Sequence, residues 1–210
     1  MQLLGRLEIK SKEKIAEFLN SEQTGRISSI DSEGYPQIIP MNFVFINDVI
    51  YMHSHIRGEK LENIIQNHKV GFEVDRNLEF LPSYFFDPDD ASLADTLYIS
   101  VVIKGHGKLV SEKNEMTLGL NALIKKYQPE GGYEPIKPEM DVLNEVAVIK
   151  IVPMTLRGKY KIGQGLRHEE RIELGEKILE RNSATAKETL EIMGFSVSDN
   201  GIKLEKDVNW

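Results

Sequence analysis

Cysteine is absent from the 210-residue chain, which excludes disulfide bonds, thiolate zinc sites and a cysteine nucleophile. No apolar run approaches the ~20 residues that a membrane-spanning helix needs. The first residues, MQLLGRLEIKSKEK, also lack the apolar core of a signal peptide. We therefore expect a cytoplasmic protein.

Positive charge is also scarce. The chain carries 26 Lys and Arg residues against 33 Asp and Glu residues, which gives a net charge of −7. Broad binding to nucleic acid or to an anionic membrane needs a basic face, so this balance argues against both. The sequence also lacks a dinucleotide-binding glycine motif, a Walker loop, an EF-hand loop, a zinc-binding helix motif and an internal repeat.

The periodicity that is present is mainly that of β-strands. Six segments are rich in β-branched and aromatic residues or alternate apolar and polar ones: residues 26–30, 38–46, 49–54, 70–74, 97–110 and 145–152. Apolar residues at helical spacing predict helices at 11–20, from 59 onward, at 112–127, and two short ones before Gly194. Antiparallel strands with turns between them favour a small closed barrel over a doubly wound sheet.

Residues 36–67 carry the chemistry that we expect to matter most. Asn47 and Asp48 form the turn of a hairpin, and its second strand ends in His53-Ser54. Gly58 then precedes a helix with Lys60 in its first turn and with Leu61, Ile64 and Ile65 at helical spacing.

This junction has two interpretations. Free N–H groups at a helix start, together with a hydroxyl and an ammonium group, suit a phosphate monoester. The alternative is an ordinary strand–turn–helix with an exposed lysine and a half-buried histidine, and we would favour that alternative if the junction stood alone. His53 and His55 share one strand face, but no third residue at ligand spacing accompanies them, so we do not expect a metal site.

The segment from Asn77 to Asp95 is predicted to be an irregular loop, with four aromatic residues at Phe80, Tyr84, Phe85 and Phe86. Such a loop either packs against a neighbouring subunit or covers a ligand, and we favour the subunit contact. Gly105 and Gly107 lie within the longest predicted strand. They indicate a β-bulge or a close approach of another group to the backbone, and we favour the bulge.

The order of GRISSIDSEGYPQIIPMNFVF, VIYMHSHIRGEKLENI, KVGFEVD and LYISVVIKGHGKLV resembles the FMN-binding split-barrel flavoproteins. This is the pyridoxamine-phosphate-oxidase-like superfamily, and the nitroimidazole-reductase type is the most similar branch. The resemblance implies a mainly β fold, a six-stranded antiparallel split β-barrel with peripheral helices. It also implies an FMN-binding domain over residues 1–160 and a C-terminal helical extension over 161–210 that packs on the barrel.

The chain departs from the family pattern at two places. The family often has two basic residues after the glycine, whereas here Gly58 is followed by Glu59 and Lys60, so Arg57 is a candidate for the missing charge. A regulator-like branch carries the pattern Gly-Lys-x-Lys-x-Ser-Gln-Asn. Residues 158–165, GKYKIGQG, match it with two glycines in place of Ser and Asn. This segment either reaches the flavin or is a solvated hinge, and the sequence favours neither.

The resemblance further implies a homodimer with FMN at the subunit interface and a redox role, with a small organic substrate and NADH or NADPH as the electron donor. It places the cofactor-binding residues at Pro40, Met41, Asn42, Phe43, His53, Ser54, Lys60, Ser100, Lys159, Lys161 and Gln164. A flavin carries out the electron transfer itself, so catalytic side chains need not be visible in the sequence. The rival hypothesis is a regulatory or storage protein that binds flavin or haem without turnover, because one fold serves many functions.

Overall fold

The computed structural model of the protein describes residues 5–208 and 210. The chain divides into two compact units, which we name after their longest helices. The α3 unit comprises Glu13–Val74 and Val101–Arg157, and the α4 unit comprises residues 5–12, Asp75–Ser100 and Gly158–Trp210. Three long strands, β6, β7 and β8, contribute residues to both units.

The strands are β1 (Glu8–Ile9), β2 (Gly25–Ile30), β3 (Pro36–Met41), β4 (Val44–Ile46), β5 (Val49–His55), β6 (Lys69–Leu81), β7 (Asp95–Val110), β8 (Val146–Lys161), β9 (Phe195–Ser198) and β10 (Gly201–Leu204). The helices are α1 (Lys12–Ser21), α2 (Glu59–Gln66), α3 (Lys113–Tyr127), α4 (His168–Arg181) and α5 (Ala186–Ile192). The predicted fold class, mainly antiparallel β with peripheral helices, is confirmed.

The main sheet has the order β3-β2-β6-β7-β8-β5-β4, with β1 added on β8. It therefore has eight strands and not six. The predicted strand 38–46 is broken at Asn42-Phe43 into β3 and β4, and the two-residue β1 was not predicted. Within the described residues no ladder joins the two end strands β3 and β4, so the sheet is not closed as a small barrel would be.

Two predicted strand ends were wrong. Strand β6 continues past Val74 to Leu81, into the segment predicted to be a loop, and β8 continues through Pro153 to Lys161. The polar residues 75–77 and the proline are local signals for a strand end. Pairing with neighbouring strands overrides such signals, because a proline is tolerated wherever its missing N–H is not needed by the ladder.

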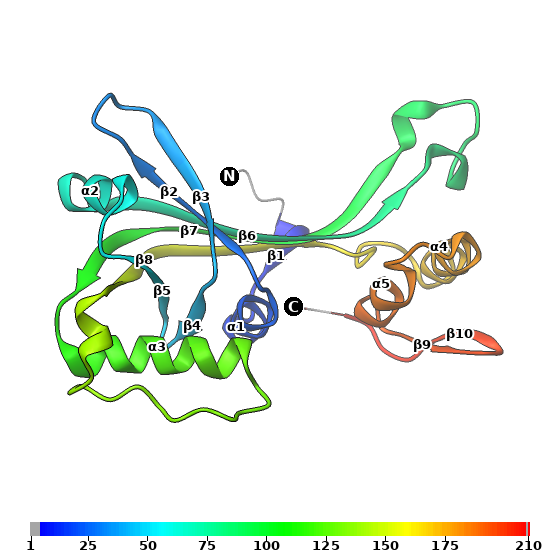
Figure 1. Ribbon diagram of the computed structural model, residues 1–210. Coiled ribbons are helices and arrows are strands. Elements are labelled where there is room, and N and C mark those ends of the chain that lie inside the picture. Colours follow the sequence, from blue (N-terminus) through cyan, green and yellow to red (C-terminus); the bar gives the residue numbers. More distant parts are fainter. Residues whose placement is uncertain (1–4, 209) are drawn as a thin grey trace. The chain divides into compact units, whose positions relative to one another are not determined.

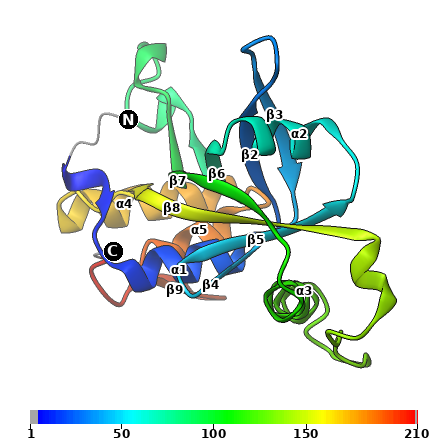
Figure 2. The ribbon, with the colours of Figure 1, turned by 90° about the vertical axis from the view of Figure 1, so that its left-hand side faces the viewer.

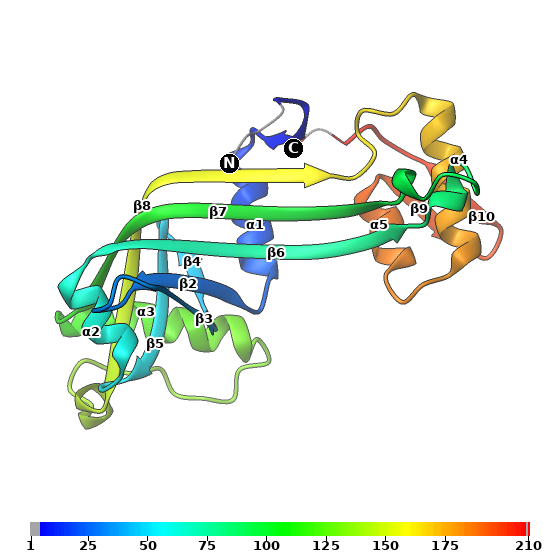
Figure 3. The ribbon, with the colours of Figure 1, turned by 90° about the horizontal axis from the view of Figure 1, so that it is seen from above.

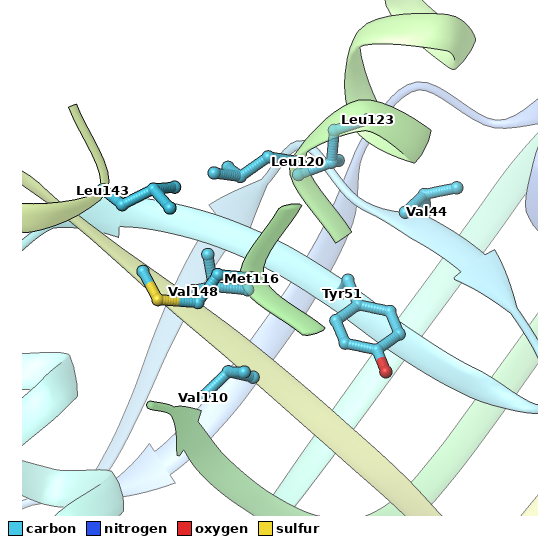
Figure 4. Close-up of a cluster of buried hydrophobic side chains, with 8 residues drawn as sticks. All are labelled: Val44, Tyr51, Val110, Met116, Leu120, Leu123, Leu143 and Val148. Carbon is cyan, nitrogen blue, oxygen red and sulfur yellow. The ribbon is translucent and has the colours of Figure 1, made fainter. Parts of the chain in front are cut away.

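In the α3 unit, local sequence accounts for the β4–β5 hairpin. Asn47 and Asp48 have φ angles of 51° and 61°, the left-handed conformation that the turn requires. Helix α3 packs on β4 and β5, as Figures 1 and 2 show from two sides. These three elements, together with residues of β7, β8 and the segment before β8, form a cluster of buried side chains drawn in Figure 4: Val44, Tyr51, Val110, Met116, Leu120, Leu123, Leu143 and Val148.

Polar contacts also hold α3 and α2 against this sheet. The Glu115 carboxylate of α3 accepts hydrogen bonds from the Tyr51 hydroxyl at 2.9 Å and from Lys150 at 2.6 Å. In α2 the buried Asn63 amide donates to Gln37 at 3.2 Å and lies 3.4 Å from the Ser29 hydroxyl. Leu61 and Ile64 are buried as predicted, whereas Ile65 is exposed and Asn63 is the third buried residue of the helix.

The two glycines of β7 mark close approaches of neighbouring groups. Strand β7 is continuous from Asp95 to Val110. A Cβ atom on Gly105 would lie 2.6 Å from the carbonyl oxygen of Val152, and one on Gly107 would lie 3.0 Å from Val70. The close approach to the backbone, one of the two interpretations, is therefore observed, and the bulge stays a prediction.

In the α4 unit, α4 packs on α5 and β10, and α5 packs on β9; Figure 3 shows these elements together. Glu79 of β6 is buried and accepts hydrogen bonds from Arg181 at the end of α4 and from Ser183 and Thr185 in the α4–α5 connection. The N-cap residue of α5 is Thr185. Gly194, with φ of 93°, follows the end of α5 as predicted.

Candidate functional site

The predicted phosphate site lies at the junction of β5 and α2. Gly58 precedes α2 with φ of 152° and ψ of 149°, a conformation that is essentially restricted to glycine. No side chain caps this helix start, so its first N–H groups remain available to an anion. The Lys60 ammonium has no carboxylate partner within residues 5–208 and 210. Glu59 and Glu62 also lie in the first turn, and their charges oppose an anion there.

His53 and Ser54 have different surroundings. Consecutive strand residues point to opposite faces of a sheet, so the two side chains diverge. The Ser54 hydroxyl donates to the His55 carbonyl at 3.1 Å, and the Arg57 N–H donates to Nδ1 of His55 at the same distance. His53 lies instead with Asn42 at an apolar pocket against α3.

Residues 40–43 connect β3 to β4. Pro40 is exposed on the edge strand, Met41 is half-buried, and the Phe43 ring is fully buried edge-on against Phe72 with centroids 5.1 Å apart. The Phe43 N–H donates to the Tyr127 hydroxyl at 2.9 Å, and its carbonyl accepts from that hydroxyl at 3.1 Å. Asn42 is exposed, and its amide makes no hydrogen bond to any described residue.

Two residues at the end of α3 were missed by the sequence analysis. Lys126 lies 3.9 Å from the centroid of the Phe43 ring and donates to the Leu19 carbonyl at 3.1 Å, and burial lowers its pKa to about 8. Burial also raises the pKa of Tyr127, so this hydroxyl keeps its proton. Tyr127 lies seven residues after Leu120 on the apolar stripe of the helix, and this spacing is the signal that could have identified it.

The remaining predicted residues belong to the α4 unit. Lys159 lies 5.1 Å from the ring centroid of Tyr98, and Lys161 forms an ion pair with Asp95. Gln164 accepts from the Ile162 N–H at 2.9 Å and donates to two backbone carbonyls, so its amide shapes the turn after β8. Ser100 is half-buried in β7.

A second pocket, of about 330 Å³, gathers two of these residues. Lys161, Gln164, Asp95 and Arg6 provide its polar atoms. Its other lining residues are Leu7, Leu81, Phe86, Leu97, Gly163, Gly165, Leu166 and Leu174. The structure thus brings together two pairs of the predicted residues, Asn42 with His53 in the α3 unit and Lys161 with Gln164 in the α4 unit. The roles of all the predicted residues in cofactor binding remain predictions.

A family model described as "Pyridoxamine 5'-phosphate oxidase" matches residues 11–160. The chain therefore belongs to this family of pyridoxamine 5'-phosphate oxidase-like proteins. No curated protein matches the chain in a sequence comparison.

Solved structures share this fold at low sequence identity. A proposed 5-nitroimidazole antibiotic resistance protein from Bacteroides thetaiotaomicron is 20% identical with a TM-score of 0.62, covering 73% of this chain and 86% of its own. The flavocytochrome Anf3 from Azotobacter vinelandii is 14% identical with a TM-score of 0.64, covering 77% and 72%. The FAD and heme binding protein from Mycobacterium smegmatis is 13% identical with a TM-score of 0.63, covering 80% of each chain.

Residues 5–208 and 210 lack two further features. No group of three or more His, Asp or Glu side chains is placed to hold a metal ion in this part of the chain. Nor is any helix within it both long and apolar enough to cross a membrane.

Proposed function

We propose that the protein is an FMN-dependent oxidoreductase that acts on a small organic substrate. The observation that carries this proposal is the uncapped start of α2 behind Gly58, with the unpaired ammonium of Lys60, in a chain of the pyridoxamine 5'-phosphate oxidase-like family. Similar structures include a flavocytochrome and an FAD-binding protein, which supports a flavin as the ligand.

The residues fit a flavin phosphate at this junction. Lys60, the free N–H groups of α2 and the nearby Arg57 would hold the phosphate, and the absence of a side chain at Gly58 keeps the approach open. Asn42 would offer its free amide to the ring, while Tyr127 holds the adjacent Phe43 backbone in place. FMN, when bound, supplies the electron transfer between a reduced nicotinamide and the substrate.

The phosphate site is tested by Lys60→Ala. One charge-assisted contact contributes about 1.5–3 kcal/mol, so we expect roughly a tenfold or larger loss of FMN affinity. Riboflavin lacks the phosphate and should bind the variant as it binds the parent. Lys69→Ala removes a nearby exposed lysine and serves as the control. Unchanged FMN affinity in Lys60→Ala would show that the phosphate binds elsewhere.

Turnover is tested under anaerobic conditions. Protein loaded with FMN is mixed with NADH or NADPH, and bleaching of the flavin absorbance is followed, then its return on adding a nitroaromatic compound. If neither nicotinamide bleaches the flavin, the oxidoreductase proposal fails and the binding or regulatory alternative replaces it.

We also propose that the protein forms a homodimer through its exposed aromatic side chains. Phe80, Tyr84 and Phe86 of the α4 unit are 52%, 61% and 51% exposed, an apolar surface that usually marks an interface. Sedimentation should give twice the chain mass of 23.9 kDa. Replacing the three aromatic residues by Ser should yield a monomer, whereas Tyr35→Ser, a similarly exposed position, should not. A monomeric parent protein contradicts the proposal.

A further inference from the structure

The apolar pocket of the α3 unit has the properties of a small-molecule site of its own. Its volume is about 290 Å³, and its lining residues are Asn42, His53, Leu120, Leu123, Ile124, Tyr127, Ile136, Val142 and Val146. A dry cavity of roughly 150 Å³ already binds benzene, so this pocket has room for one or two rings with a substituent. Leu120 and Leu123, seen in Figure 4, contribute to both the buried core and the pocket wall.

The wall opposite the sheet is held in place by specific hydrogen bonds. The Asn121 amide of α3 donates to the Ile136 carbonyl at 2.8 Å and accepts from the Ile136 N–H at 2.8 Å. These two hydrogen bonds hold the segment after α3 against the helix. The pocket is therefore already formed without a ligand, as most small-molecule sites are.

The polar groups of the pocket determine which ligands it accepts. No Lys, Arg, Asp or Glu is among the lining residues, so a charged group would lose its hydration without gaining a partner. The side chains of Asn42 and His53 make no hydrogen bond to any described residue, and both are exposed. They can bind one polar substituent while the rest of the ligand packs on Leu, Ile and Val.

We propose that this pocket binds an uncharged, largely apolar molecule of one or two rings that carries a single hydrogen-bonding substituent. The inference goes beyond the proposed function, because it concerns a ligand other than the flavin, although both proposals use Asn42. FMN itself does not suit the pocket, since its phosphate would find no cation among the lining residues.

The test uses 2-naphthol as the probe, with binding measured by calorimetry on the purified full-length protein. We expect 2-naphthoate, which has the same rings but carries a charge, to bind at least tenfold more weakly. Asn42→Ala should lower the affinity for 2-naphthol severalfold and leave the affinity for naphthalene unchanged, because naphthalene makes no hydrogen bond.

A pocket-filling variant locates the probe. Val142→Trp places a large side chain at a lining position that is 43% exposed, and it should lower the affinity for 2-naphthol at least tenfold. Leu118→Trp is the matched control, since Leu118 is 45% exposed on α3 but does not line the pocket. Equal affinity for 2-naphthoate or equal effects of the two Trp variants would each overturn the proposal. The Lys60→Ala result bears only on FMN, so the two proposals fail separately.

Discussion

The α3 unit and the α4 unit bury polar groups in different ways. The buried polar side chains of the α3 unit are neutral: Ser29, Asn63 and Thr117. Those of the α4 unit include two ionised residues, Glu79 and Arg171, beside Thr189. In the α3 unit a helix covers a sheet and supplies a continuous apolar cluster, whereas the α4 unit joins short helices and a small hairpin.

The difference shows what holds each unit together. A buried carboxylate is tolerated only when hydrogen bonds satisfy it, and Glu79 has three such partners, Arg181 at the end of α4 and Ser183 and Thr185 in the α4–α5 connection. Arg171 donates to the Met193 carbonyl and to Asp207, while its Nε has no partner among the described residues. Charged contacts of this kind are directional, so they select one position for the connection where apolar packing alone would permit several. The α4 unit is therefore the more sensitive of the two to loss of a single polar side chain.

The sharpest test of this comparison is Glu79→Ala, for which we expect the largest effect. The Glu79 side chain is 1% exposed, and its removal leaves Arg181, Ser183 and Thr185 without their shared acceptor. We predict a loss of about 3 kcal/mol in the free energy of unfolding, measured by urea denaturation. Lys203→Gln breaks an exposed ion pair of the same unit and should leave the urea midpoint unchanged. If Glu79→Ala had the same urea midpoint as the parent, the proposed difference between the two units would be contradicted.

Steric packing is the corresponding weak point of the α3 unit. In Gly105→Ala the new Cβ would lie 2.6 Å from the Val152 carbonyl oxygen, so β7 and β8 must shift apart. We expect a loss of about 2 kcal/mol in unfolding free energy. Gly71→Ala is the control, because its Cβ would lie at an ordinary 3.6 Å from Ser28. Equal stability of the two variants would contradict the close approach.

The partly exposed ion pair between Lys150 and Glu115 in the α3 unit should contribute less to stability, and its contribution should depend on pH. The hydrogen bond from Lys150 is the main cause that lowers the pKa of Glu115 below its usual 4.5. A lowered carboxyl pKa stabilises the folded state above that usual value, and the contribution is lost as the pH falls through the folded pKa. Glu115→Gln should therefore cost about 1 kcal/mol at neutral pH and nothing in strong acid. Urea denaturation across the acid range checks this, and a pH-independent difference would contradict it.

Lys126 gives the smallest expected effect, and stability should again rise with pH, but in the alkaline range. Burial lowers its pKa from 10.5 to about 8, so the folded state binds fewer protons than the unfolded state between these values. The parent protein should therefore gain stability relative to Lys126→Met as the pH rises from about 8 towards 10.5. We expect a change of about 1 kcal/mol or less, because water screens the half-buried amine. Lys125→Met, an exposed neighbour, should show no such trend.

The sequence alone determined the features that depend on neighbouring residues. The apolar stripe of α1, the alternation of Val70, Phe72 and Val74, and the left-handed turn at Asn47-Asp48 were all predicted and confirmed. Each depends on backbone geometry repeated over a few residues, which residue spacing reveals directly. The flavoprotein-like family was likewise identified from the order of such segments, and the family match confirmed it.

Only the tertiary structure decided the features that depend on distant partners. Three such features could not be read from the local residue pattern: the continuation of β8 through Pro153, the burial of Glu79 and the break between β3 and β4 at Asn42-Phe43. The same holds for the pocket that joins Asn42 and His53 to α3 and to Ile136. The physical reason is that pairing, burial and charge satisfaction depend on which groups meet in space, and residues far apart in the chain supply those groups.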